Sequence, residues 1–173
     1  MSKEEEKIRL DGVAVPRVER DYLGFEPYDH QAQAQEVIKN EDRFFAVNTS
    51  PTGSGKTYSW LKPALDEGID TIAVFPTNAL IADQYETTKN LIDSHYPKIN
   101  VVELTGETAS EWRDAYRGRR NKGEAIRLKL DESLGKYKTT IVLTNPDIFT
   151  LMRKDMYRHN DVEGIPTRFG MLV

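Results

Sequence analysis

The chain has 173 residues, no cysteine and a formal net charge of −4. A chain of this length makes one α/β domain or most of one, and buries roughly 70% of its unfolded surface. The lack of cysteine excludes a disulfide framework and a thiolate metal site, and the acidic balance excludes a broadly basic coat for nucleic acid. No apolar run reaches the ~20 residues of a membrane span, and the Glu-rich start does not suit a secretory signal, so we expect a cytoplasmic protein.

Apolar runs and helical spacings alternate along the chain after a polar arm at residues 1–24. The spacing of Ala34, Val37 and Ile38 predicts a first helix over residues 28–39. Strands are expected at 43–48, 71–75, 100–104 and 139–144, and helices at 55–66, 77–95, 107–117, 121–133 and 146–156. Strands that alternate with helices of this length predict a parallel-sheet α/β domain with helices on both faces. Ligands of such a sheet bind at the carboxyl ends of its strands.

The most informative stretch, Ser50 to Thr57, reads Ser-Pro-Thr-Gly-Ser-Gly-Lys-Thr. Glycines between an apolar run and a helix let backbone N–H groups form an anion nest at the positive end of the helix. In such a loop Lys56 reaches the β- and γ-phosphates of ATP and Thr57 ligates Mg²⁺, which makes them the catalytic pair and Thr57 the metal ligand. An ordinary glycine-rich turn is the alternative. The residues predicted to hold the nucleotide phosphates are Thr52, Gly53, Ser54, Gly55, Lys56 and Thr57.

Gln31 lies upstream of this loop, in the stretch Phe25-x-Pro27-Tyr28-x-x-Gln31. A side-chain amide offers a donor and an acceptor together, which match N7 and the N6 amine of adenine. We therefore predict that Gln31 binds the adenine ring, with a surface helix position as the alternative.

Three further loops follow the predicted strands, each with residues that suit a helix start. Thr77 or Asn78 can cap one helix, and Pro146 suits the first turn of another, so caps alone could explain each loop. Their order after the glycine-rich loop instead predicts one continuous phosphate-binding rim. The residues predicted to contact nucleic acid are Pro76, Thr77, Asn78, Thr105, Gly106, Thr144, Asn145 and Asp147.

Taken in this order, the motifs resemble the first RecA-like domain of superfamily 2 helicases, over residues 25–173. The stretch from Ser50, with serine where the strict phosphate loop has glycine, resembles motif I, and Phe25 to Gln31 resembles the Q motif. That resemblance implies that Tyr28 packs near the adenine, that ATP and Mg²⁺ are the cofactors, and that the substrate is a single-stranded nucleic acid, with DNA favoured. The loops after the later strands resemble motifs Ia and Ib of the same superfamily.

The sequence of residues 48–57 and 143–147 is similar to the corresponding motifs in the helicase of type I-D CRISPR interference systems. This narrower resemblance implies a CRISPR effector complex as partner and a role in antiviral defence. The chain has His30, His95 and His159 but no His-Asp step, so we expect no HD nuclease within it.

Residues 170–173 read as the start of another buried strand. The resemblance implies that an Asp-Glu pair and a second RecA-like domain follow in the full helicase. We therefore expect this chain to be a fragment that binds ATP, depends on the remainder of the helicase chain, and is inactive in hydrolysis by itself.

Residues 107–138 carry several cations and form an insertion between two predicted strands. They could touch DNA or a partner, or form solvated amphipathic helices, because acidic residues are interleaved with the basic ones. The cations considered for such a contact are Arg113, Arg117, Arg119, Arg120, Lys122, Arg127 and Lys129.

Two other functions remain open from the residues. Another P-loop enzyme, such as a small-molecule kinase, would respond to a small acceptor rather than to nucleic acid. A non-enzymatic nucleotide-binding or docking module would bind ATP without turnover.

Overall fold

The computed structural model describes residues 27–41, 43–51, 53–96, 98–116, 121–158 and 165–173. The predicted arm, Phe25, Thr52 and the cations Arg117, Arg119 and Arg120 lie outside these residues, as does His159. The chain divides into two compact units, one up to Pro63 and one from Ala64. The predicted boundaries at residue 24 and of the insertion at 107–138 stay predictions.

The first unit contains α1 (Asp29–Asn40), an extended segment, the glycine-rich loop and the start of α2 (Lys56–Glu67). Both helices confirm the sequence expectation to within a residue or two. α1 begins where the extended backbone of Tyr28 ends, and the Tyr28 N–H donates to Oε1 of Gln31 at 2.9 Å. α2 contains Pro63, which marks the boundary between the units.

The strand predicted at residues 43–48 is wrong. These residues form no strand, and their apolar side chains are exposed, with Phe45 at 93% and Val47 at 57%. A β-strand needs a hydrogen-bonded neighbouring strand as well as an apolar sequence, and a local apolar pattern does not supply that neighbour.

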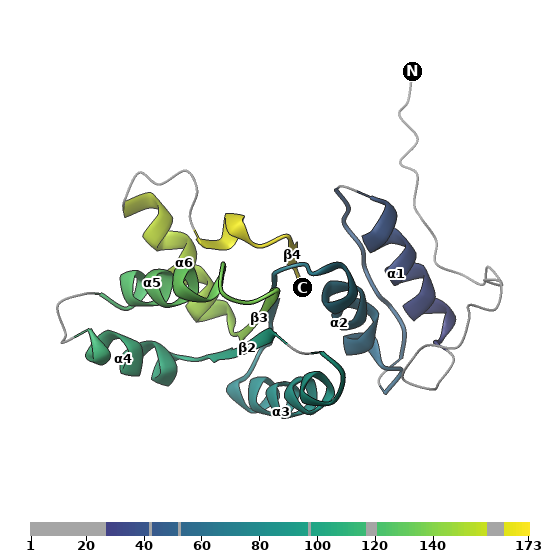
Figure 1. Ribbon diagram of the computed structural model, residues 1–173, viewed down its shortest axis with the longest axis horizontal. Coiled ribbons are helices and arrows are strands. Elements are labelled where there is room, and N and C mark those ends of the chain that lie inside the picture. Colours follow the sequence, from purple (N-terminus) through teal and green to yellow (C-terminus); the bar gives the residue numbers. More distant parts are fainter. Residues whose placement is uncertain (1–26, 42, 52, 97, 117–120, 159–164) are drawn as a thin grey trace, which may run out of the picture. The chain divides into compact units, whose positions relative to one another are not determined.

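The second unit is built on a four-stranded parallel sheet (Figure 1). Its strands are β1 (Thr71–Val74), β2 (Ile99–Leu104), β3 (Thr139–Thr144) and β4 (Met171–Leu172), in the order β2-β3-β1-β4. The predicted strands at 71–75, 100–104 and 139–144 are confirmed. β4 confirms the strand start expected in residues 170–173.

Helices cover both faces of this sheet, as expected, with α3 on one side of β2 and β3 and with α5 and α6 on the other (Figure 1). The helices of this unit are α3 (Asn78–His95), α4 (Gly106–Ala115), α5 (Lys122–Ser133) and α6 (Pro146–Arg158), followed by a 3₁₀ turn, η1 (Ile165–Arg168). The core under α4 to α6 joins one face of the strands to the helices. Its buried members are Ile72, Leu104, Ala109, Ile126, Leu130, Val142, Ile148 and Met152. None of the described helices is long and apolar enough to cross a membrane.

Asp70 joins three strands at the amino end of the sheet. Its carboxylate accepts a hydrogen bond from the Thr140 N–H at 2.6 Å, and its carbonyl accepts one from the Gly170 N–H at 2.9 Å. Burial raises the pKa of the Asp70 carboxyl, an effect that the bond from Thr140 partly offsets.

Candidate nucleotide and nucleic-acid sites

The glycine-rich loop has the backbone that an anion nest needs. Gly53 and Gly55 have φ angles of +81° and +74°, in the left-handed region that side chains rarely adopt. A Cβ added to Gly53 would meet nothing within 4 Å, so one side of the loop is open. The loop leads directly into α2, whose first residue is Lys56. This geometry fits the nucleotide phosphates that the sequence predicts here.

Side chains hold this loop in shape. The Lys56 ammonium donates to the carbonyl oxygens of Ser50 and Pro51 at 2.7 and 2.8 Å. The Ser50 hydroxyl donates to Oδ1 of Asn48 at 2.6 Å and accepts from the Ser54 hydroxyl at 2.8 Å. Serine in place of the usual glycine therefore ties the two arms of the loop together. The sequence predicts no role for Asn48, although its side-chain oxygen accepts hydrogen bonds from both the N–H and the hydroxyl of Ser50.

Gln31 joins α1 to the glycine-rich loop. Its side chain is 2% exposed, and its Nε2 donates to the Gly55 carbonyl at 3.0 Å while its Oε1 accepts from Tyr28. A Cβ added to Gly55 would lie 2.6 Å from Nε2, so any other residue there would have to displace the Gln31 amide and would also be strained by the positive φ. Both ends of the amide therefore bind backbone, a contact that sequence spacing did not predict.

Tyr28, the aromatic residue predicted to lie near the adenine, is 65% exposed at the start of α1. Its ring stacks on His30, with centroids 5.9 Å apart and planes at 11°. Thr57 lies in the first turn of α2 and is half-buried. The roles of Tyr28 and Gln31 toward adenine, and of Thr57 toward Mg²⁺, stay predictions.

The other predicted loops come together at the carboxyl edge of the sheet in the second unit. Val74 and Leu104 both pair in register with Thr144, so β1, β2 and β3 end at the same level. We call residues 76–78, 105–106 and 144–147, which lie between the ends of these strands and the first turns of the next helices, the carboxyl-edge rim. Each continues into a helix, namely α3, α4 and α6.

The three helices of the carboxyl-edge rim are capped alike. The Thr77 hydroxyl accepts from the Leu80 N–H at 3.2 Å, and the Thr105 hydroxyl accepts from the Thr108 N–H at 3.4 Å. The Asn145 Oδ1 accepts from the Ile148 N–H at 2.9 Å. Each cap satisfies one terminal N–H, and the positive ends of three helices meet at one edge.

Side chains also connect one rim loop to the next. The Thr144 hydroxyl donates to the Leu104 carbonyl at 2.8 Å, and the Asn145 Nδ2 donates to Oδ1 of Asn78, also at 2.8 Å. Thr144 is fully buried, so its hydroxyl bonds across the strands, whereas Pro76, Thr77 and Asn78 are exposed.

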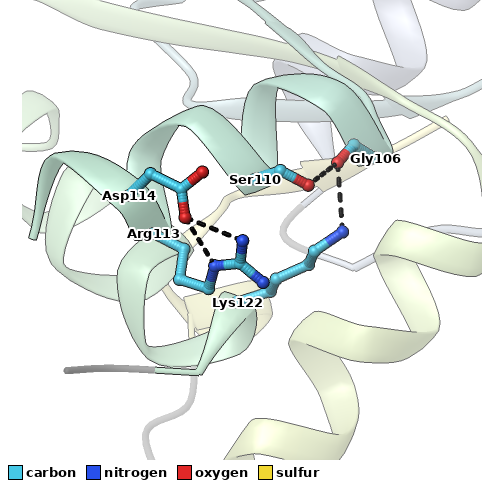
Figure 2. Close-up of polar contacts among 5 residues, drawn as sticks. All are labelled: Gly106, Ser110, Arg113, Asp114 and Lys122. Carbon is cyan, nitrogen blue, oxygen red and sulfur yellow. Dashed lines mark hydrogen bonds and ion pairs between the residues drawn. The ribbon is translucent and has the colours of Figure 1, made fainter. Parts of the chain in front are cut away.

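Lys122 reaches the rim from the start of α5. Figure 2 shows its ammonium and the Ser110 hydroxyl both directed at the Gly106 carbonyl, at 3.3 and 2.8 Å. The rim loops themselves contain no Lys or Arg, and Asp147 adds an exposed carboxylate in the first turn of α6. The electrostatics of the rim therefore combine helix N-termini, one bonded lysine and one carboxylate.

Comparison with known proteins agrees with this arrangement. A stretch of 36% identity over 89 residues matches Druantia protein DruE of Escherichia coli (strain UMEA 4076-1), covering 42% of this chain. The chain spans only 5% of the length of that relative. Residues 28–158, most of the chain, match the DEAD/DEAH box helicase family. The chain therefore belongs to the DEAD/DEAH box helicase family.

Proposed function

We propose that the chain forms the ATP-binding part of an ATP-dependent helicase or translocase, and that the carboxyl-edge rim binds the backbone of a nucleic-acid strand. The observation that carries the proposal is the set of three capped helix N-termini, level with one another at the carboxyl edge of a parallel sheet. Backbone N–H groups at such termini bind phosphate oxygens.

ATP with Mg²⁺ would be held by the glycine-rich loop. Gly53, Ser54 and Gly55 would supply backbone N–H groups, and Thr52 would also contribute to the phosphate-binding loop. Lys56 would bind the outer phosphates, and Thr57 would ligate the metal. When bound, Mg²⁺-ATP supplies a γ-phosphoryl group whose hydrolysis drives the motor. The Lys56 ammonium already bonds two carbonyl oxygens in the loop, so it lies within reach of an anion there.

The contacts around Gln31 connect the predicted adenine site with the phosphate site. A purine bound at Tyr28 and Gln31 would contact the same side-chain amide that donates a hydrogen bond to the Gly55 carbonyl. This contact supports a role for Gln31 in shaping the phosphate loop when adenine binds.

The narrower features of the proposal rest on the sequence. DNA as the favoured substrate, a CRISPR effector complex as partner and a role in type I-D interference rest on the wording of residues 48–57 and 143–147. That the chain is part of a longer helicase is tested by the intact mass of the native protein from its source. A native chain with an acidic pair after Val173 would support it, and a mass of 19.8 kDa would favour a binding module. That the chain is inactive by itself in hydrolysis is tested by its DNA-stimulated ATP turnover, and turnover that Lys56→Ala abolishes would contradict it.

Nucleotide binding is tested by titrating a fluorescent ATP analogue into the chain with Mg²⁺. We expect saturable binding, a loss of tenfold or more in affinity for Lys56→Ala, and little change for Lys39→Ala in the last turn of α1. Equal affinities in Lys56→Ala and the unaltered chain would contradict the assignment.

Nucleic-acid binding is tested by fluorescence anisotropy with labelled deoxythymidine and uridine 12-mers over a range of salt concentrations. We expect a log–log salt dependence, because phosphate contacts release counterions. Thr77→Ala together with Asn78→Ala should weaken binding to both strands, and tighter binding of the DNA strand would support the DNA assignment. A small phosphate acceptor that raises turnover in the longer protein, where nucleic acid does not, would instead favour the kinase alternative.

A further inference from the structure

A cavity of about 420 Å³ lies along the outer edge of β2, between α3 on one face of the sheet and α4 and α5 on the other. We call this cavity the β2 groove. The residues that line it are Tyr85, Asn100, Val101, Val102, Glu103, Trp112, Lys129, Glu132, Ser133, Lys136 and Tyr137.

The β2 groove straddles the edge of the strand. Side chains of consecutive strand residues point to opposite faces, and four consecutive residues, 100–103, line the cavity. Tyr85 of α3 forms one wall, and Trp112 of α4 stands on the other face with residues of α5 and the turn that follows it. The floor of the cavity is therefore the backbone edge of β2.

That edge presents hydrogen-bonding groups outward. In the described sheet β2 pairs with β3 alone. The Lys98 carbonyl accepts a hydrogen bond from the Lys138 N–H, and the Leu104 carbonyl accepts one from the Thr144 hydroxyl. The backbone N–H and C=O groups of the even-numbered residues of β2 therefore point toward β3. Because N–H and C=O groups alternate in direction along a strand, those of Val101 and Glu103 point into the groove.

We propose that the β2 groove binds an extended peptide of a partner protein, which adds to the sheet as a strand beside β2. Extended backbone is the ligand that matches alternating N–H and C=O groups, and side-chain pockets on both sides give such sites their specificity. A nucleic-acid base offers no repeating complement to this floor.

The walls define the chemistry of the peptide. Trp112 and Tyr137 form apolar walls suited to an aromatic or branched side chain. Lys129 and Lys136 bring two cations to the groove, and Glu103 and Glu132 bring two carboxylates. Glu132 already accepts hydrogen bonds from Tyr116 and Lys129, whereas the Lys136 ammonium lies 5.4 Å from the centroid of the Tyr137 ring. An acidic residue two positions from the apolar one would lie on the same side of the added strand and face Lys136.

The experiment is a selection of peptides from a displayed library of random 12-mers against the 173-residue chain, followed by anisotropy with the selected synthetic peptides. We expect sequences with an apolar and an acidic residue two positions apart. Methylating alternate backbone nitrogens of the peptide should weaken binding about tenfold or more, because it removes the donors of the added strand.

Variants of the chain locate the site. Val101→Pro removes an N–H that faces outward, so it should block strand addition while keeping the pairing with β3, and Val101→Thr is the matched control. Lys136→Glu should weaken binding of the acidic peptides about tenfold, and Lys138→Glu, in the same turn but outside the groove lining, should leave it unchanged. Circular dichroism establishes which variants fold. Lys136→Glu tests the groove even if Val101→Pro does not fold.

Two results would overturn the proposal. One is a library whose selected peptides bind Lys136→Glu and the methylated-backbone controls as tightly as the unaltered pair. The other is a deoxythymidine 12-mer that crosslinks to Trp112, loses affinity in Lys136→Glu, and is not displaced by the selected peptides. The second result would assign the β2 groove to nucleic acid.

Discussion

The amide of Asn145 donates to Oδ1 of Asn78 at 2.8 Å, across a sequence separation of 67 residues. The same Asn145 side chain accepts from the Ile148 N–H, so it caps α6 while it fixes the loop after β3 against the loop after β1. Two segments of the carboxyl-edge rim are thereby held in one relative position by a single side chain.

Replacing Asn145 separates these two tasks. Asn145→Asp keeps an acceptor for the Ile148 N–H but loses the donor to Asn78 and adds a negative charge. We expect thermal stability close to that of the unaltered chain and about a tenfold loss of affinity for a deoxythymidine 12-mer. Asn90→Asp, with the same charge change on the exposed surface of α3, should bind normally. Equal losses in both variants would mean that charge alone, and not the rim, determines affinity.

Gly55 and Gln31 should be energetically coupled. Gly53→Ala meets open space and should cost about 1–2 kcal/mol through its left-handed φ alone. Gly55→Ala should cost about 1–3 kcal/mol more, because its Cβ displaces the buried Gln31 amide. In a Gln31→Ala background this extra cost should disappear. Urea unfolding of the four-member cycle measures the coupling, and strictly additive free energies would contradict it.

Asp70 should make stability fall as pH rises. Its folded-state pKa is raised by burial, so its contribution is fully present below the unfolded pKa and is lost as pH rises through the folded pKa. Asp70→Asn keeps an acceptor for the Thr140 N–H and cannot ionise. Relative to the unaltered chain, this variant should therefore gain in free energy of unfolding between pH 4 and pH 7.

Urea unfolding across that pH range tests the role of Asp70, with Asp83→Asn on the exposed surface of α3 as the control. A relative stability of Asp70→Asn that is flat or falls with rising pH would show that burial does not dominate at this carboxyl.

Lys122 should contribute one ionic contact to strand binding. Lys122→Gln keeps a donor for the Gly106 carbonyl but removes the charge, so the log–log salt slope should fall by roughly 0.7 for a single strand. Lys89→Gln, whose parent ammonium lies over the Tyr85 ring, is the control. An unchanged slope in Lys122→Gln would place this ammonium outside the phosphate path and limit it to holding Gly106.

Short apolar runs bounded by turn residues were enough to predict the strands of the second unit and the helices after them. The segment at 43–48 has the same local pattern, yet it forms no strand, because pairing depends on a neighbour that local sequence does not specify. Local pattern was therefore enough to predict the strands that pair within the second unit, and not enough for the segment of the first unit.

The residues of the candidate site could be predicted from the sequence to a similar extent. The positions of the rim residues followed from strand ends, but Thr144 is fully buried rather than facing a ligand. Alternation gives the reason, since Thr144 shares a face of β3 with Val142, which packs in the core under α4 to α6. The bond from Gln31 to Gly55 spans 24 residues between two helices, and no periodicity encodes such a contact.

The proline inside α2 has a mechanical consequence. Residue 63 has no N–H to donate to the carbonyl one turn earlier, so α2 lacks one rung of its ladder at the point where the first unit gives way to the second. Bending stiffness in a helix comes from that ladder, and α2 is therefore most compliant at this turn. Lys56, the first residue of α2, therefore lies about two turns from the position where the same helix bends most easily.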